Sequence, residues 1–114
     1  MKSKAELIEI SGVFDTSAEY CSFYEFAVNY LFNLKEKKIT DTDRFFETIK
    51  TLGDNSGIRA NFAAFGKQSR NAKEVIKPWC TKMLEHRKDL ADLSVDELHY
   101  VMGYCARRAK FVKG

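Results

Sequence analysis

The sequence predicts an all-α protein, a single-domain bundle of five to six short helices over residues 1–114. Apolar residues recur at helical spacing in several segments. No run alternates apolar and polar residues with β-branched enrichment, so no sheet is expected. At 114 residues the chain is long enough to bury one core without metal or disulfide crosslinks.

Two segments near the N-terminus precede the central helices. Residues 5–10 are compatible with a helical turn or a strand, which Gly12 ends. The next helix is expected to open at Thr16, because Thr16 and Glu19 have the capping-box spacing, and to run to about Glu36. It is aromatic on nearly all sides, so the segment Thr16–Glu36 lies either at the centre of the domain or against a partner. The sequence does not decide whether this segment belongs to the core or to an interface.

The middle of the chain predicts three further helices. The first starts within residues 40–43 and ends at Gly53, and a short second one, with Ile58, Phe62 and Phe65, stops near Gly66. Residues 67–73 form a polar, basic connection without apolar period. The third helix extends to about Arg87 and contains Pro78, so it either kinks there or begins there with Pro78 in its first turn. We favour a start at Pro78.

The last helix, from Ser94 to about Phe111, carries the clearest signals. Ser94 and Glu97 have the capping-box spacing, and Leu93 and Leu98 are placed for a hydrophobic staple. Basic residues crowd the last turn, where the helix dipole favours them. One apolar stripe with a period near 3.6 residues is formed by Leu98, Val101, Met102, Cys105, Ala109 and Val112.

The net charge of +3 conceals an uneven distribution of charge along the chain. Residues 1–43 carry −3, residues 44–88 carry +6, residues 89–104 carry −4 and residues 105–114 carry +4. Segments of like sign can gather into separate acidic and basic faces on folding. The modest net charge is therefore compatible with a polyanionic partner.

The residues that usually carry catalysis or bind metals are poorly placed for either. His86 and His99 each lie six residues from a cysteine, which does not match zinc-site spacing. No glycine-rich phosphate loop occurs, and the paired carboxylates fall at helix starts. We expect no enzymatic activity, no metal and no cofactor. The three cysteines lack a CxxC pair, and no long apolar run occurs, which predicts reduced thiols in a cytoplasmic protein.

Binding to phosphates is the function that the charge pattern favours. Lysine and arginine neutralise phosphates, and amide and hydroxyl groups donate to phosphate oxygens, so contact with DNA or RNA would be largely independent of sequence. The sequence does not distinguish DNA from RNA. The predicted contact residues are Arg59, Lys67, Gln68, Arg70, Asn71, Lys73, Lys77, Arg107, Arg108 and Lys110.

The stretch Glu97–Tyr104, followed by Arg107 and Arg108, resembles the closing helix of the small helical subunit of CRISPR interference complexes (Cascade-like or type III). In such subunits an aromatic-Leu/Met-Gly stretch precedes basic residues. The resemblance implies a subunit of a ribonucleoprotein in antiviral defence, with other protein subunits and several copies of itself as partners. It also implies sequence-independent contact with the target or displaced strand, because guide pairing supplies the sequence.

The alternative function is a protein-binding helical adaptor or inhibitor, of the phage or toxin–antitoxin type. Exposed aromatic side chains anchor many protein interfaces. In this alternative the interface is an aromatic ridge formed by Tyr20, Phe23, Tyr24, Phe26 and Phe32.

Overall fold

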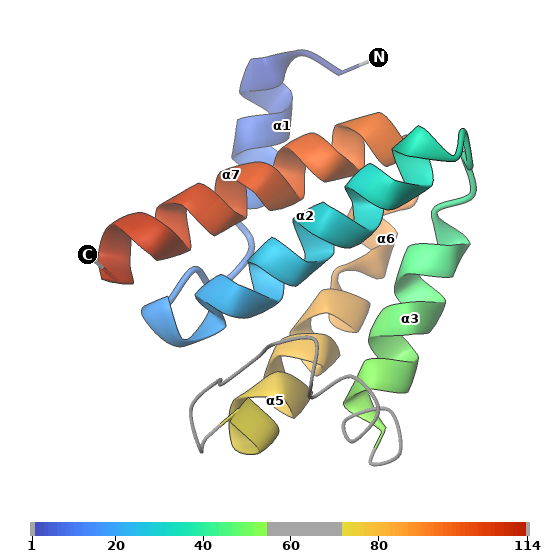
Figure 1. Cartoon of the computed structure of the whole chain (residues 1–114). Coiled ribbons are helices and arrows are strands. Elements are labelled where there is room, and N and C mark those ends of the chain that lie inside the picture. The colour runs from blue at the N-terminus through green and yellow to red at the C-terminus, as the bar shows by residue number, and fades with distance from the viewer. Residues whose placement is uncertain (1, 55–71, 114) are drawn as a thin grey trace.

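The computed structural model describes residues 2–54 and 72–113, which contain helices and no strand. The predicted all-α fold class is therefore confirmed for this part of the chain. The helix expected around Ile58–Gly66 and the connection at 67–71 lie outside the described residues. In chain order the elements are α1 (Lys4–Ser11), a 3-10 turn η1 (Ala18–Tyr20), α2 (Cys21–Glu36), α3 (Asp43–Gly53), α5 (Ala72–Glu85), α6 (Arg87–Leu90) and α7 (Val95–Lys113) (Figure 1).

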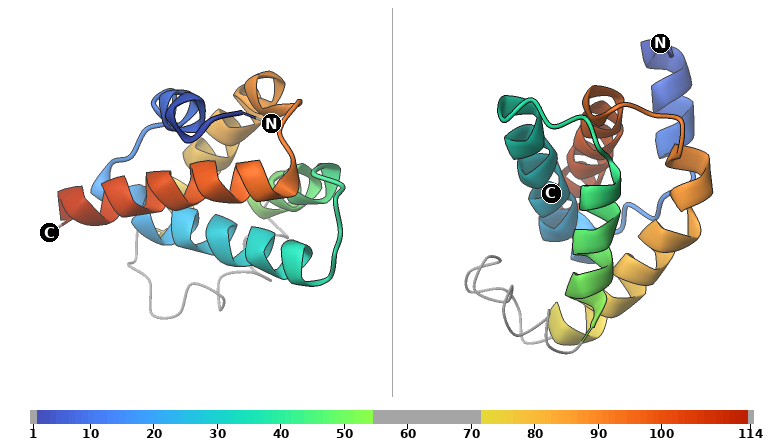
Figure 2. Two further views of the ribbon diagram at one scale, coloured as in Figure 1. Left: turned by 90° about the horizontal axis from the view of Figure 1, so that it is seen from above. Right: turned by 90° about the vertical axis from the view of Figure 1, so that its right-hand side faces the viewer.

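Helix α7 is the central element of the bundle. It lies between α1 on one side and α2 on the other, and α2 and α7 run antiparallel along most of their length (Figure 2). The second pair of packed helices is α3 and α5, and η1 contacts α2, α5 and α7. Within the described ranges, no helix has the length and apolar composition needed to cross a membrane.

The apolar stripe of α7 enters the core as predicted, except at its end. Leu98, Val101, Met102, Cys105 and Ala109 are buried, whereas Val112 is 63% exposed. Val112 lies in the last turn, where the helix projects beyond its neighbours (Figure 1). The apolar period of the sequence continues there, but none of the described helices covers Val112.

The aromatic helix α2 belongs mainly to the core and not to an interface. Tyr20, Phe23 and Tyr24 are buried, and the ring centroids of Phe23 and Tyr24 each lie 5.6 Å from that of Trp79 on α5. Phe26 is partly buried against the same core. Of the predicted aromatic ridge only Phe32 is exposed, at 47%, so the ridge is not available as a continuous surface.

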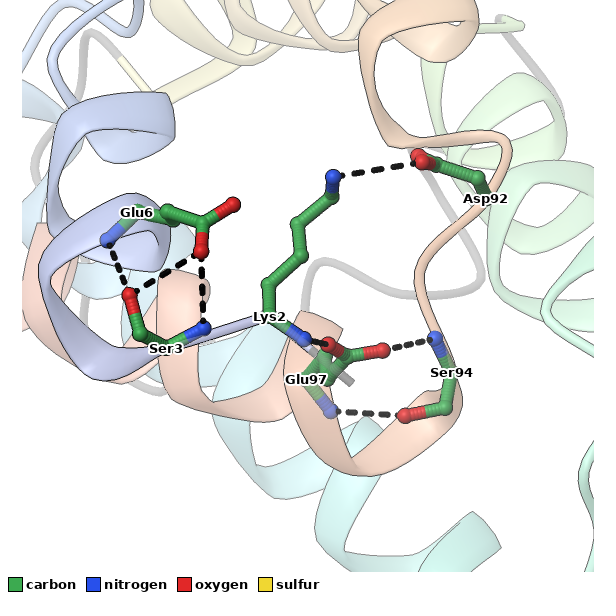
Figure 3. Close-up of polar contacts among 6 residues, drawn as sticks. All are labelled: Lys2, Ser3, Glu6, Asp92, Ser94 and Glu97. Carbon is green, nitrogen blue, oxygen red and sulfur yellow. Dashed lines mark hydrogen bonds and ion pairs between the residues drawn. The ribbon is translucent and has the colours of Figure 1, made fainter.

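The start of α7 has the predicted capping box (Figure 3). The Glu97 backbone N–H donates to the Ser94 hydroxyl at 3.1 Å, and the Ser94 N–H donates to the Glu97 carboxylate at 3.1 Å. The second carboxylate oxygen of Glu97 accepts the Lys2 backbone N–H at 2.8 Å, and the Lys2 ammonium lies 3.4 Å from Asp92. Leu93 and Leu98 are both buried, as a staple requires. Glu97 therefore caps α7 and holds the N-terminal segment against it.

Acid is expected to weaken the fold partly through Glu97. Hydrogen bonds from the Lys2 and Ser94 backbone N–H groups lower the pKa of this carboxyl below 4.5. The unfolded chain then binds the proton more readily, so the stabilisation is present above about pH 4.5 and is lost as the pH falls through the lower, folded-state pKa. The urea concentration at the unfolding midpoint should fall as the pH is lowered from about 7 to about 3, and in Glu97→Gln this fall should be smaller than in the unmodified protein. An unchanged loss would contradict this role.

A separate variant provides the comparison for Glu97. The pKa of Asp15 is also lowered, first by hydrogen bonding to Ser17 and then by Lys82, so Asp15 contributes acid sensitivity of the same sign. Asp15→Asn and Glu97→Gln should each remove part of the pH dependence. Trp79 is the single tryptophan and is buried, so its fluorescence reports unfolding in every variant.

Helix α1 is capped in the same manner as α7, which decides between the two readings of residues 5–10. The Glu6 N–H donates to the Ser3 hydroxyl at 3.2 Å, and the Glu6 carboxylate accepts the Ser3 N–H at 3.3 Å (Figure 3). Gly12 ends the helix, its N–H bonded to the Glu9 and Ile10 carbonyls. The segment is a helix.

The predicted capping box at Thr16 is wrong. A 3-10 turn precedes α2, and the cap residue of that turn, Ser17, makes no side-chain capping bond. The carboxylate of Asp15 instead accepts hydrogen bonds from Ser17 and pairs with Lys82 on α5 at 3.0 Å. The polar contacts at this point of the chain are thus made by Asp15, with Ser17 and with the distant Lys82, and not by the predicted pair Thr16 and Glu19.

The predicted start of a helix at Pro78 is also wrong. Helix α5 begins at Ala72 and continues through Pro78 to Glu85. Pro78 is exposed, while Ile76, Trp79 and Cys80 are buried, so the proline ring lies on the outer face and the apolar face stays continuous. The short helix α6, which follows α5 directly, was not predicted.

Helix α2 ends in a Schellman motif with a lysine in the left-handed conformation. The Ile39 N–H donates to the Leu34 carbonyl at 2.9 Å, the Lys38 N–H donates to the Lys35 carbonyl at 3.0 Å, and Lys38 has φ 59°. Because this conformation costs an L-residue roughly 1–2 kcal/mol, Lys38→Gly should raise the free energy of unfolding by about 1 kcal/mol. Urea unfolding measures the change, with Lys37→Gly as control, since Lys37 has φ −84° and should gain nothing.

Candidate nucleic-acid interface

The ten predicted contact residues fall into three groups in the structure. Five of them, Arg59, Lys67, Gln68, Arg70 and Asn71, lie outside the described residues. Lys73 belongs to α5, but its side chain is not described, and Lys77 is exposed on α5. Arg107, Arg108 and Lys110 are exposed in the last third of α7.

The three residues on α7 carry positive charge that no described carboxylate neutralises. Arg107, Arg108 and Lys110 have no carboxylate within ion-pair distance in the described ranges. By contrast, Lys35 pairs with Asp96 at 2.7 Å. Lys82 and Arg87 likewise pair with Asp15 and Asp43, at 3.0 and 2.9 Å respectively. Other described bases, such as Lys37 and Lys77, are also outside these ion pairs, but the end of α7 places three such bases within the stretch 107–110.

Aromatic side chains are interleaved with these bases. Tyr104, Arg107, Arg108 and Phe111 are spaced i, i+3, i+4 and i+7, so they lie on one face of α7. The guanidinium carbons of Arg107 and Arg108 lie 5.7 and 5.9 Å from the centroid of the Tyr104 ring. Phe111 is 87% exposed. We call Tyr104, Arg107, Arg108, Lys110 and Phe111 the basic end of α7.

The basic end of α7 borders two hollows, and Arg107 lines both. The first, of about 390 Å³, is bounded by the Tyr104–Phe111 face together with Thr16 and Val112. The second, of about 620 Å³, is a groove between α2 and α7. The groove is lined by Glu25, Val28 and Asn29 of α2 and by His99, Tyr100, Gly103, Ala106, Arg107 and Lys110 of α7.

The groove is uncharged at its far end near neutral pH. Burial lowers the pKa of His99 below 6.5, and the nearby Lys35 ammonium lowers it further, while Asp96 acts in the opposite direction. The ring of His99 also lies 6.2 Å from that of Phe32. The positive charge of the groove therefore comes from Arg107 and Lys110.

Acidic residues gather at the opposite end of α7. A hollow of about 440 Å³ is bordered by Glu6, Glu9, Asp89 and Asp92, together with Lys2. The Lys2 ammonium is already paired with Asp92. The described part of the molecule thus has an acidic region near the start of α7 and a basic region at its end. It does not show one strip that also includes Lys77, because Lys77 lies on a different helix and lines neither hollow that Arg107 borders.

The described cysteines are buried, and candidate metal ligands are not grouped in the described ranges. Among residues 2–54 and 72–113 no three His, Cys, Asp or Glu side chains are grouped as metal ligands. Cys21, Cys80 and Cys105 are buried and are not joined in a disulfide. Burial raises the pKa of Cys80 and of Cys105 to about 12, so both thiols are protonated at neutral pH.

Tyr104 and Phe111 were not among the contact residues predicted from the sequence. Their i, i+7 spacing around Arg107 and Arg108 was a usable signal, since it places all four on one helical face. No such signal in the sequence indicates that Val28 and Asn29 line the groove, because their position there depends on how α2 packs against α7. Comparisons of the chain with family models, with curated proteins and with solved structures gave no match.

Proposed function

We propose that this chain binds single-stranded nucleic acid without catalysing a reaction, through the basic end of α7. The observation that carries the proposal is that Arg107, Arg108 and Lys110 have no carboxylate partner among the described residues and alternate with aromatic side chains. Unpaired bases are free to neutralise phosphates and to release their counterions. A local carboxylate would compete with the phosphates for the same groups.

The aromatic residues favour a single strand over a duplex. Exposed aromatic rings stack on unpaired bases, whereas the bases of a duplex are already stacked on one another. Phe111 is almost fully exposed, and Tyr104 lies next to two guanidinium groups that orient it. The combination of positive charge with stacking rings is typical of binding that depends little on sequence.

The test of this function uses the unmodified protein and labelled single-stranded DNA and RNA of random sequence. Fluorescence anisotropy at salt concentrations from about 50 to about 200 mM should give a log–log slope of roughly −2, since each of three phosphate contacts contributes about −0.7. Affinities for unrelated sequences should be similar. Absence of binding at the low salt concentration, or binding insensitive to salt, would overturn the proposal.

The resemblance of Glu97–Tyr104 to small CRISPR subunits suggests a setting for this activity. In that setting the basic end of α7 would hold a target or displaced strand inside a ribonucleoprotein, with other subunits or further copies of this chain beside it. Capture of the tagged protein from cells at mild salt, with and without nuclease, tests the setting. A ribonucleoprotein partner would dissociate or shrink after nuclease treatment.

The protein-binding adaptor remains the second candidate, with less surface than the sequence suggested. Among residues 2–54 and 72–113, the exposed large apolar side chains are Val13, Phe32, Phe111 and Val112. Phe111 belongs to the basic end of α7 and Val112 follows it directly, so one surface would serve both candidates. Nuclease-resistant retention of a protein partner, together with no oligonucleotide binding, would favour the adaptor.

A further inference from the structure

Gly103 lies in the middle of α7, and the packing of residues 2–54 and 72–113 gives no reason for a glycine there. Glycine destabilises a helix interior relative to alanine. A Cβ atom at Gly103 would meet nothing within 4 Å. Gly53 is a useful contrast, because a Cβ there would lie 3.2 Å from the Cβ of Cys80, so close packing of α3 on α5 explains that glycine. At Gly103 the space is open.

The open space above Gly103 is the groove between α2 and α7. Its apolar lining comes from Val28 and Ala106 on either side of the glycine, and Tyr100 adds an aromatic wall one turn before it. Arg107 and Lys110 lie one and two turns after it and supply the positive charge. The groove, of about 620 Å³, is within the size range of small-ligand sites.

We propose that this groove receives a nucleobase of the strand whose phosphates contact Arg107 and Lys110. The inference rests on the proposed function and deepens it, because it assigns a position to a base as well as to the backbone. A base has apolar faces that suit Val28 and Ala106 and a polar edge within reach of the Asn29 amide. The absence of a side chain at Gly103 lets a flat ring approach the helix backbone closely.

Charge complementarity selects a nucleic acid as the occupant. The two cations of the groove, Arg107 and Lys110, have no carboxylate within ion-pair distance in the described ranges, and they continue directly into the rest of the basic end of α7. The one acidic group of the lining, Glu25, is on α2, across the groove, and its carboxylate accepts from the Cys21 thiol at 3.5 Å. A base in the groove and a phosphate at its basic end therefore fit the same strand.

The test compares two strands of equal length, oligo-dT and the same sugar–phosphate backbone carrying abasic sites, on three proteins. The unmodified protein should bind oligo-dT roughly tenfold more tightly than the abasic strand. Gly103→Leu fills the groove, so its preference for oligo-dT should fall several-fold, to the part that stacking on the exposed Phe111 ring still supplies. Gly103→Ala, which adds only a Cβ, should keep most of the preference.

Both substitutions should raise the melting temperature, by roughly 4 °C for alanine, because each replaces glycine with a better helix former. A rise would show that lost base preference in Gly103→Leu is not caused by unfolding. Equal binding of both strands by the unmodified protein, or an unchanged preference in Gly103→Leu, would overturn the base site while leaving the salt-dependent phosphate contacts standing. Failure of the unmodified protein to bind either strand would overturn the proposed function as well.

Discussion

Arg107→Glu combined with Arg108→Glu is expected to weaken binding of a random-sequence single strand at least tenfold at about 50 mM salt. The substitutions remove two phosphate contacts and put two negative charges in their place. They also remove the two guanidinium groups 5.7 and 5.9 Å from the Tyr104 ring, so the ring loses its neighbours as well. Fluorescence anisotropy with labelled DNA and RNA measures the change.

A second pair of substitutions controls for net charge. Lys4→Glu combined with Lys37→Glu alters the net charge by the same amount, at exposed positions on α1 and after α2. This control should keep nearly all of the affinity, because neither lysine belongs to the basic end of α7. Equal losses in the two double variants would mean that only net charge matters, and would contradict the location of the site.

Leu31→Ala is expected to destabilise the protein by about 2–5 kcal/mol. Leu31 is fully buried on α2, the helix that packs along α7, so its truncation leaves a cavity in the core. A loss of this size should lower the melting temperature by roughly 10–20 °C. Urea and thermal unfolding followed by Trp79 fluorescence measure it.

The adjacent residue provides a matched control for the orientation of α2. Phe32 is 47% exposed, and its ring centroid lies 6.2 Å from that of His99 on α7. Phe32→Ala should therefore cost less than about 1 kcal/mol, although it removes a larger side chain than Leu31→Ala does. If Phe32→Ala lowered the free energy of unfolding as much as Leu31→Ala does, the orientation of α2 in the structure would be contradicted.

Local signals in the sequence predicted the helices that local interactions determine. The capping box at Ser94 and Glu97 and the apolar period of α7 involve residues within a few positions of one another, and both occur in the structure. The predicted capping box failed near Thr16, where the structure has a contact between residues far apart in the sequence. Asp15 pairs with Lys82, 67 residues away, and no spacing near Thr16 could indicate this.

The candidate site also has a part that the sequence could predict and a part that depends on the fold. The exposed arginines of α7 and their aromatic neighbours could be predicted, because helical geometry alone places Arg107 and Arg108 beside Tyr104. The sequence could not predict which lysines and arginines are neutralised by ion pairs. Arg87 pairs with Asp43, 44 residues away, and Lys82 with Asp15, so only the fold distinguishes neutralised from available charge. The groove over Gly103 likewise requires α2 as its second wall.

The most direct measurement of the site is amide chemical-shift mapping of the uniformly ¹⁵N-labelled protein during titration with a short single-stranded oligonucleotide. The proposal predicts the largest shifts at the basic end of α7 and around Gly103, with smaller ones at Val28 and Asn29 across the groove. Shifts confined to other parts of the chain, such as the predicted contact residues between 59 and 77, would contradict it, and so would a spectrum that does not change.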